Sequence, residues 1–311
     1  MKVAVIQAPP VLLDRAATLA RMVAAIAAAA ADGAGLVVFP EAYIPGYPTW
    51  IWRLRPGADM ALASDIHARL RAEAVDVARG DLAPLTEAVA RHGVTVVASF
   101  SELDSEVSGT TLFNTAVVIG PDGAILNRRR KLVPTNPERM VWGRGDAEGL
   151  EVVETPAGRL GVLICWEAYM PFARMALYAQ KLEILVLPTW DAGEEWLATA
   201  RHIAREGGCF VIAAATAIQG RDVPADFPGR SQLFPDEDEW ICDGDAVIVS
   251  PGGRLLAGPL HREKGALTGE IDREAALRAR RSLDVTGHYA RPDIFRLSVN
   301  RAPMRSVVFD D

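Results

Sequence analysis

The stretch Gly158–Pro171, GRLGVLICWEAYMP, decides the fold and directs attention to one side chain. It is an apolar, strand-like run that ends at Cys165 and continues into a segment predicted to be helical. Free cysteine is among the most often buried residues, so Cys165 could be a small core side chain. A strand that ends at a thiol beside a helix N-terminus could instead present a nucleophile, because the helix dipole favours a thiolate.

The composition of the chain restricts the classes of function. Its 311 residues are 50% hydrophobic and 23% charged, which is typical of a globular protein. The net charge of −7 argues against nucleic acid or an anionic membrane as the main partner, since both require basic surfaces. The one dense basic run, Arg128–Lys131, is interpreted mostly as a solvated strand end.

The N-terminus and the cysteines indicate a cytoplasmic protein. MKVAVIQAPP lacks the regions of a signal peptide, and the alanine-rich stretch 19–35 is interrupted by charges, which predicts a soluble helix rather than a membrane span. The three cysteines show no CxxC spacing. We therefore predict a reduced protein without disulfides or a zinc site, in which Cys209 and Cys242 are structural.

The pattern of strands and helices occurs twice along the chain. The first half is predicted to contain strands 2–8, 35–43 and 94–100, helices 16–31 and 83–92, and a hairpin 114–131 that turns at Pro-Asp-Gly. The second half is predicted to contain strands 159–165, 183–190 and 209–217, helices 171–181 and 195–206, a hairpin 245–260 and a final strand 265–272.

Two β-α-β-α-β-hairpin halves predict two mixed sheets stacked face to face with helices outside, a four-layer α-β-β-α sandwich. A doubly wound parallel sheet is the alternative, but the hairpins count against it. We predict one domain over residues 1–275. Residues 276–311 form a C-terminal tail with a basic helix and an extended, partly apolar segment, which requires its own domain or a neighbouring subunit to pack on.

Two charged residues lie at strand ends, as Cys165 does. A thiol nucleophile needs a base and a group that stabilises developing negative charge. The five histidines show no motif that ties them to Cys165. Glu41 follows the apolar run LVVFP, and Lys131 ends a hairpin strand. Because strand ends converge on a common rim in layered α/β folds, these side chains could meet the thiol.

In the order Glu, Lys, Cys, these residues and their surroundings resemble the nitrilase superfamily. The motifs are FPEAYIPGYP around Glu41, RRKLVPTNPERMVWGRGD around Lys131 and ICWEAYMP around Cys165. The resemblance extends from Val3 to about Leu297, and CWE followed by YMP resembles the true nitrilase branch. The fold implied is the same α-β-β-α sandwich.

The resemblance implies a hydrolase that converts an organic nitrile to the carboxylic acid and ammonia without metal or organic cofactor. Cys165 would be the nucleophile, Glu41 the general base and Lys131 the residue that steadies the charged intermediate. Glu138 matches a second family glutamate, and the Trp166 amide is a candidate oxyanion donor. The chain departs from the branch at Ala168, where many members have asparagine, which leaves the proportion of acid to amide product open.

Several points stay open at this stage. Aromatic residues near the strand ends could belong to the core or line a pocket. The pocket candidates are Tyr47, Trp52, Trp142 and Trp190. The wider aromatic set also includes Trp50 and Trp196, and at least half of this set is expected to lie in the core or at an interface. The resemblance implies a homodimer or a larger, spiral homo-oligomer. The rival functions are an amidase or carbamoylase of the same superfamily, a cyanide-hydrolysing enzyme, and an inactive scaffold.

Overall fold

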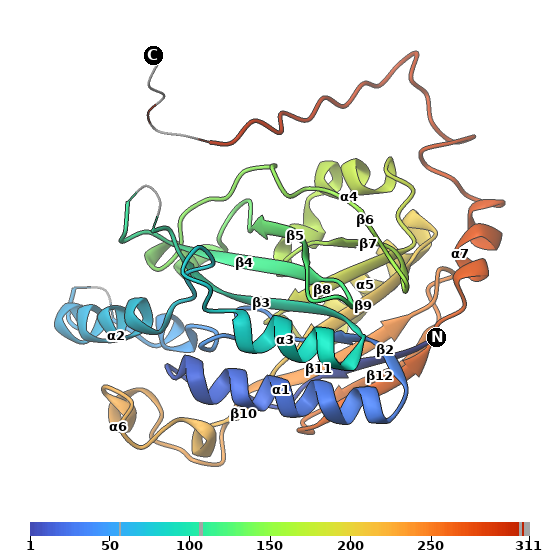
Figure 1. The fold of residues 1–311 in the computed structure, drawn as a ribbon. Helices are drawn as coiled ribbons and strands as arrows, with labels where there is room; N and C mark the ends of the chain where they lie inside the picture. Colours follow the sequence, from blue (N-terminus) through green and yellow to red (C-terminus); the bar gives the residue numbers. More distant parts are fainter. Residues whose placement is uncertain (56, 106–107, 305–306, 308–311) are drawn as a thin grey trace.

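Two mixed β-sheets lie face to face in the computed structural model, and helices cover their outer faces (Figure 1). The structure describes residues 1–55, 57–105, 108–304 and 307. The α-β-β-α sandwich predicted from the order of strands and helices is confirmed.

The first sheet contains strands from both ends of the chain. Its order is β13 (Ala266–Glu270), β1 (Lys2–Ile6), β2 (Ala34–Val38), β3 (Thr95–Leu103), β4 (Leu112–Ile119) and β5 (Ile125–Arg130). Strands β1, β2 and β3 are parallel, and the hairpin β4–β5 adds to them antiparallel. The sequence predicts the final strand, but its place beside β1 in the sheet of the first half is a finding of the structure.

The second sheet repeats this plan. Its order is β10 (Ala217–Gln219), β11 (Trp240–Val249), β9 (Phe210–Ala215), β8 (Ile184–Thr189), β7 (Gly158–Val162) and β6 (Val153–Thr155), and β12 (Leu255–His261) pairs with β11. Strands β7, β8 and β9 are parallel. In each sheet the parallel strands therefore direct their carboxyl ends toward one rim.

Helices α1 (Arg15–Ala31) and α3 (Ala83–His92) pack on the first sheet, and α4 (Pro171–Tyr178) and α5 (Glu194–Gly207) pack on the second. Asp14 caps α1 by accepting from Ala17 N, and α3 ends at Gly93 with a left-handed φ of 65° that favours glycine. The sequence analysis did not predict α2 (Met60–Glu73), α6 (Arg230–Leu233), or the short 3-10 helices η1 (Thr49–Trp52), η2 (Asn136–Met140), η3 (Cys165–Tyr169) and η4 (Gly220–Asp222).

The core has one layer between the sheets and one under each pair of helices. Strand β1 shows why: Val3 and Val5 belong to the cluster between the sheets, whereas Ala4 and Ile6 face α1. Successive side chains of a strand point to opposite faces, so a strand buried on both sides is apolar throughout. Such strands are stiff, and the residues that follow them are held in place.

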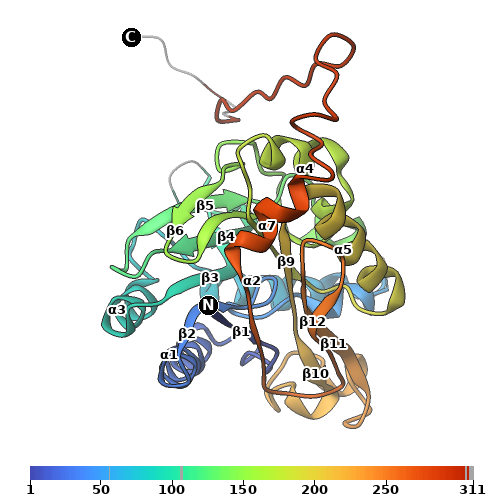
Figure 2. The ribbon, with the colours of Figure 1, turned by 90° about the vertical axis from the view of Figure 1, so that its right-hand side faces the viewer.

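The C-terminal segment leaves the sandwich after α7 (Arg273–Arg280), which lies across one end of the sheets (Figure 2). Ala276 of α7 is fully buried in the core between the sheets, so the predicted boundary at residue 275 falls inside a packed helix. Residues 281–295 form a series of hydrogen-bonded turns, in which Val285 still packs on the core, and residues 296–304 have no regular structure. Large apolar side chains of this segment are exposed, among them Tyr289 and Phe295. Arg301 pairs with Glu151 on the body of the protein.

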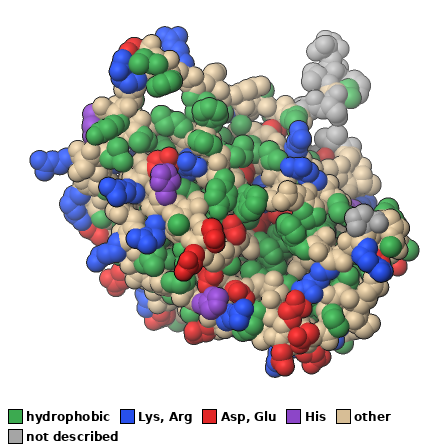
Figure 3. Space-filling view, turned by 180° about the vertical axis from the view of Figure 1, so that it is seen from behind, with side chains coloured by type: hydrophobic (Ala, Val, Ile, Leu, Met, Phe, Trp, Pro, Cys, Tyr) green, Lys and Arg blue, Asp and Glu red, His purple; other side chains and the backbone are tan. Residues whose placement is uncertain are grey.

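The surface carries charges of both signs. On the face shown in Figure 3, side chains of both signs occur, the acidic ones mainly on the lower part, and hydrophobic areas lie above and between them. Among the helices in the described part of the chain, none is long and apolar enough to span a membrane.

Candidate active site

The structure brings Glu41, Lys131 and Cys165 together at the rim where the parallel strands end. Glu41 lies three residues beyond β2, Lys131 directly follows β5, and Cys165 lies three residues beyond β7. Each of the three side chains is almost completely buried. The strand ends of both sheets thus contribute to one group of side chains.

Four residues form the Lys131 cluster: Glu41, Asn114, Lys131 and Glu138. The Lys131 Nζ donates to Glu41 Oε1 at 2.7 Å and to Glu138 Oε2 at 2.8 Å. Asn114 Nδ2, from β4, also donates to Glu41 Oε1 at 2.8 Å. The second carboxylate oxygen, Glu41 Oε2, is buried without a hydrogen-bond partner among the described residues. A buried oxygen without a partner is rare and requires an explanation, and here the Cys165 thiol lies beside the carboxyl group.

The charges of the Lys131 cluster shift its acid–base properties. Burial, together with the Glu138 carboxylate and despite the attraction of Lys131, raises the pKa of Glu41 to about 7. Burial opposes the charge of Lys131, but the carboxylates of Glu41 and Glu138 outweigh it and raise the pKa of Lys131. A carboxylate with a pKa near neutrality beside a permanent ammonium can accept and return a proton at physiological pH.

Cys165 is presented by a strained turn. Its φ of 53° lies in the left-handed region, which non-glycine residues adopt at a cost of about 1–3 kcal/mol. Its Sγ accepts a hydrogen bond from Thr189 Oγ1 of β8 at 3.2 Å. The Cys165 thiol lies beside the Glu41 carboxyl, close enough to lower the pKa of that carboxyl.

The expected lowering of the Cys165 pKa by a helix N-terminus is wrong. Cys165 opens only the five-residue 3-10 helix η3, and α4 begins six residues later at Pro171. Burial and the Glu41 carboxylate raise the pKa of the thiol well above its usual value. Cys165 therefore rests as a thiol, and a base must remove its proton.

The interpretation of Arg128–Lys131 as a solvated run is wrong for two of its four charges, Arg129 and Lys131. Lys131 belongs to the Lys131 cluster, and the Arg129 guanidinium is buried against Glu167, with its Nη2 2.7 Å from Glu167 Oε1. Glu167 also accepts from the backbone N of Leu132 and of Ile164, at 2.6 Å each. These two residues are the neighbours of Lys131 and Cys165. We call Arg129 and Glu167 the Arg129 pair; it joins the two sheets beside the site.

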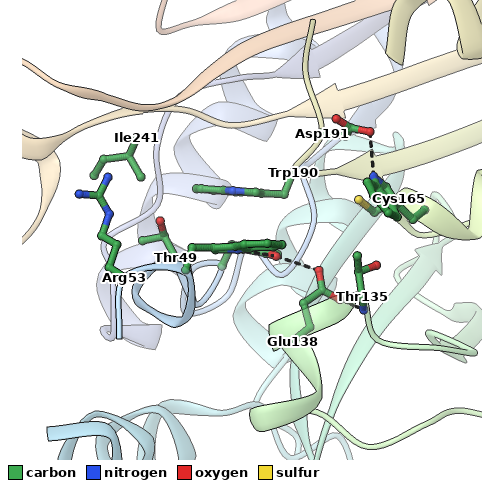
Figure 4. Close-up of a pocket in the computed structure, with 11 residues that line it drawn as sticks. Thr49, Arg53, Thr135, Glu138, Cys165, Trp190, Asp191 and Ile241 are labelled. Atoms are coloured by element: carbon green, nitrogen blue, oxygen red, sulfur yellow. Dashed lines mark hydrogen bonds between the residues drawn. The ribbon is translucent and has the colours of Figure 1, made fainter. Parts of the chain in front are cut away.

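A pocket of about 300 Å³ opens onto Cys165 (Figure 4). Its lining comprises Tyr47, Thr49, Trp52, Arg53, Thr135, Glu138, Cys165, Trp166, Trp190, Asp191 and Ile241. Tyr47 stacks on Trp190 with ring centroids 4.3 Å apart, and its hydroxyl donates to Glu138 Oε1 at 2.8 Å. Glu138 thus touches both the pocket and Lys131, while Glu41 and Lys131 are buried behind these lining residues.

The aromatic pocket candidates divide into two groups. Tyr47, Trp52 and Trp190 line the pocket. Trp142 does not: it is buried behind Tyr47, edge-on to that ring, and its Nε1 donates to Ser101 Oγ at 3.2 Å. Trp142 was a pocket candidate, but it lies two residues beyond η2 and its side chain belongs to a core cluster. Trp50 and Trp196 are also core residues.

The pocket wall next to Cys165 comes from η3 and from the loop after β8. Trp166 is half exposed, and its Nε1 donates to Asp191 Oδ2 at 2.8 Å. Burial raises the pKa of Asp191 above its ordinary value. The sequence analysis missed Asn114, Thr189 and Asp191 as site residues; the last two lie in the stretch LPTWD, residues 187–191.

The other cysteines lie outside this site. Cys209 is buried at the end of α5, and Cys242 is buried in β11; both are free, as Cys165 is. Over the described residues, no three His, Cys, Asp or Glu side chains group in a way that could hold a metal ion.

Comparison with known proteins places the chain in a family. The model of the carbon-nitrogen hydrolase family matches residues 2–281. The chain belongs to the carbon-nitrogen hydrolase family. It is therefore a hydrolase of carbon–nitrogen bonds that acts on small molecules, as the resemblance to the nitrilase superfamily predicted.

Named relatives match this carbon-nitrogen hydrolase over nearly its whole length. An aliphatic nitrilase of Sinorhizobium fredii is 39% identical over 99% of this chain and 98% of its own. Nitrilase 2 of Arabidopsis thaliana is 39% identical over 99% of this chain and 91% of its own. A bifunctional nitrilase/nitrile hydratase of Lupinus angustifolius is 38% identical over 99% and 88%.

Solved structures share the fold. A carbon-nitrogen hydrolase of Helicobacter pylori aligns with a TM-score of 0.71 over 95% of this chain and 96% of its own, at 21% identity. Nit3 of Saccharomyces cerevisiae aligns with a TM-score of 0.68 over 93% and 96%, at 19% identity.

Proposed function

We propose that this carbon-nitrogen hydrolase is a nitrilase, which converts an organic nitrile and two waters to the carboxylic acid and ammonia. The observation that carries the proposal is the meeting of a buried thiol, Cys165, with a carboxylate whose oxygen Glu41 Oε2 has no hydrogen-bond partner in the described structure. The relatives named as nitrilases support nitriles over amides as the substrate class.

The first half of the proposed reaction forms a covalent thioimidate. Glu41 accepts the Cys165 proton, Sγ forms a bond to the nitrile carbon, and one π bond of the nitrile breaks. The nitrile nitrogen takes up a proton, which Glu41 returns. The pKa of Glu41, about 7, suits a group that both accepts and donates a proton near neutral pH.

The second half releases ammonia and then the acid. Glu41 accepts a proton from the first water as the water oxygen bonds to the thioimidate carbon. The C=N π bond breaks, the nitrogen takes the proton from Glu41, and Lys131 stabilises the tetrahedral species that forms. Glu41 then accepts the proton of the new hydroxyl group as the C=O bond of a thioester forms and the C–N bond breaks, and it returns this proton to the leaving nitrogen, which departs as ammonia. A second water, deprotonated by Glu41, displaces Cys165 as the carboxylic acid forms, and the thiol regains its proton.

Glu138 and Trp166 are proposed to support this chemistry. Glu138 holds Lys131 Nζ at 2.8 Å and receives the Tyr47 hydroxyl, so it fixes the ammonium relative to the pocket wall. The Trp166 amide follows Cys165 directly and is a candidate donor to the charge that develops on the nitrile nitrogen.

The pocket supports an uncharged substrate with an apolar body. Tyr47, Trp52 and Trp190 provide aromatic surface. Three charged residues of the described chain line the pocket. The Arg53 guanidinium pairs with Glu239 at 2.7 Å and Glu138 pairs with Lys131, whereas Asp191 accepts a hydrogen bond from Trp166 Nε1 and would repel an anionic substrate. A substrate without charge leaves these pairs intact.

We also infer that the protein forms a homo-oligomer and that it acts in the cytoplasm. Exposed Ile294 and Phe295 on the tail, residues 276–311, support a contact with a second copy, since large apolar side chains gain stability when they are buried. Sedimentation of the full chain and of a chain ending at Arg281 tests this: the shorter chain should form smaller assemblies. Equal assemblies would remove the tail from the contact.

The test of the proposed function is product analysis. Ammonia, acid and amide should be measured from aromatic, arylacetic and aliphatic nitriles, from their amides and from cyanide. Acid and ammonia from nitriles, lost in Cys165→Ala and kept in Cys209→Ala, would support the proposal. Turnover of amides alone would indicate an amidase or carbamoylase, and turnover of cyanide alone a cyanide hydrolase. No turnover in either the wild type or Cys165→Ala would favour a scaffold.

A further inference from the structure

Thr189 touches the sulfur of Cys165, and the nitrilase chemistry proposed above leaves this contact unused. Thr189 is the last residue of β8 and is fully buried. Its Oγ1 lies 3.2 Å from Cys165 Sγ and 2.9 Å from the backbone N of Asp191. Thr189 pairs with Ala215 of β9, and this pairing together with the hydrogen bond from the Asp191 backbone N holds Oγ1 in place.

The direction of the hydrogen bond to sulfur follows from the contacts of both groups. A hydroxyl has one hydrogen to donate and two lone pairs that accept. The Asp191 N–H can only donate, so it uses one lone pair of Thr189 Oγ1 and leaves the hydroxyl hydrogen available. The Cys165 thiol proton faces the Glu41 carboxyl, so the Thr189 hydroxyl donates to Sγ and the sulfur is the acceptor.

Such a bond strengthens as negative charge builds on the sulfur. A neutral thiol is a weak acceptor, whereas hydrogen bonds to charged groups are about twice as strong as neutral ones. The groups that act on Sγ besides Thr189 are Glu41 and Glu138, which disfavour a thiolate, and Lys131, which favours it; burial disfavours it further. A donor next to Sγ thus opposes the two carboxylates and the loss of solvent.

We propose that Thr189 is a catalytic residue whose hydroxyl donates to Cys165 Sγ and stabilises the thiolate, both when the sulfur attacks and when it leaves the thioester. Thr189 transfers no proton: the Cys165 proton goes to Glu41 and returns from it. The proposal rests on Cys165 being the nucleophile. The hydrogen bond stabilises the states in which the sulfur carries negative charge more than it stabilises the resting thiol. Only such a difference in stabilisation raises the rate.

The test is the pH dependence of alkylation of Cys165 by iodoacetamide, which requires no nitrile. Thr189→Val keeps the branched shape but removes the hydroxyl, and Thr189→Ser keeps the hydroxyl. The Cys165 adduct is identified by mass spectrometry, which separates it from Cys209 and Cys242. Thr189→Val should move the alkylation profile to higher pH and lower the rate at neutral pH about 10- to 100-fold. Thr189→Ser should restore most of the rate.

Two controls separate this role from a structural one. Thr115→Val removes another buried hydroxyl, which donates to Glu102 rather than to sulfur, and should leave the alkylation profile unchanged. On a nitrile substrate, Thr189→Val should lower kcat more than it raises KM. An unchanged alkylation profile in Thr189→Val, or a change in KM alone, would overturn the proposal and leave Thr189 as a support of the Asp191 loop. If Thr189→Val does not fold, Thr189→Ala and Thr189→Ser provide the same comparison.

If nitriles are not substrates, the alkylation experiment still decides the role of Thr189. A shifted alkylation profile without nitrile turnover would keep the Thr189 proposal and refute only the nitrilase assignment.

Discussion

Two buried cation–carboxylate groups stand two residues apart on the same segment of chain, and they differ in how completely their carboxylate oxygens are paired. In the Arg129 pair, both Glu167 oxygens accept two hydrogen bonds each. In the Lys131 cluster, one oxygen of Glu41 accepts from both Lys131 and Asn114, whereas Oε2 has no partner in the described structure.

This difference indicates that Glu167 supports the structure, whereas Glu41 takes part in the reaction. A carboxylate with all its lone pairs occupied cannot accept a proton without losing a bond, so Glu167 can only hold its neighbours in place. A carboxylate with a free oxygen next to a thiol is costly to bury and is ready to accept a proton. The Arg129 pair fixes the backbone beside Lys131 and Cys165, and this rigidity keeps the Glu41 oxygen directed at the thiol.

The largest expected effect comes from removing the free oxygen. Glu41→Gln should lower kcat on a nitrile about 10²- to 10⁴-fold, which is the usual contribution of a general base. The amide oxygen can still accept from Lys131 and Asn114, so the thermal midpoint should change by only a few degrees. The measurement is steady-state kinetics beside thermal unfolding. Activity within tenfold of the wild type would show that Glu41 is not the base.

The second prediction concerns stability and uses a substitution that breaks the Arg129 pair. Glu167→Gln replaces one acceptor with an NH2 group that faces N–H donors and leaves Arg129 buried without an anion. Breaking a buried ion pair costs about 3–5 kcal/mol, so the free energy of unfolding in denaturant should fall by that amount.

The matched control for Glu167→Gln is Glu102→Gln. Glu102 accepts from Arg130, the neighbour of Arg129, but the Arg130 side chain is 26% exposed and can turn to water. Glu102 also binds no backbone amide beside the site residues. Its substitution should cost about 1–2 kcal/mol. Equal losses in the two variants would mean that the linkage to the site loops adds no stability.

The smallest expected effect tests how the charges of the Lys131 cluster set the pKa of Glu41. Glu41 must be ionised to act as a base, so kcat/KM should fall as the pH drops below about 7. The Glu138 carboxylate is one of the groups that raise the pKa of Glu41. Glu138→Gln removes this charge and should move the acid limb to lower pH by about 1 unit.

Tyr47→Phe is the control for Glu138→Gln, because it removes the hydrogen bond to Glu138 without changing a charge. Its acid limb should stay near pH 7. The pH profiles are taken with a substrate that does not titrate. If the acid limb stays at the same pH in both variants, the group responsible for the limb is not Glu41.

The sequence predicts the sandwich and two of the three central side chains for the same reason. Strands buried on both faces are continuous apolar runs, so the Glu41 or Cys165 that follows such a run is conspicuous. Lys131 follows the basic, partly exposed strand β5 and is identified from the motif around it. The Arg129 pair could not be predicted, because its partners are 38 residues apart and an arginine in a basic run resembles a solvated one. Thr189 was missed because threonine is common in strands.

Other features depend on three-dimensional packing. Helix α2 was missed because only Ile66 and Leu70 of its residues are buried, which gives a weak periodic pattern. The strained φ of Cys165 depends on the contacts of η3, and its high thiol pKa depends on burial and on Glu41, which lies far away in the sequence.

The pairing of β13 with β1 bears on how the protein is made. Ala266 of β13 lies opposite Ile6 of β1, so this edge of β1 has no partner strand until β13 has been synthesised. At about 5–20 residues per second, a ribosome needs roughly 10–50 s to synthesise the intervening chain. During that time β1 exposes an apolar edge that can pair with other nascent chains. Any truncation before β13 makes this temporary exposure permanent, so shortened versions of the protein should aggregate even when every active-site residue is present.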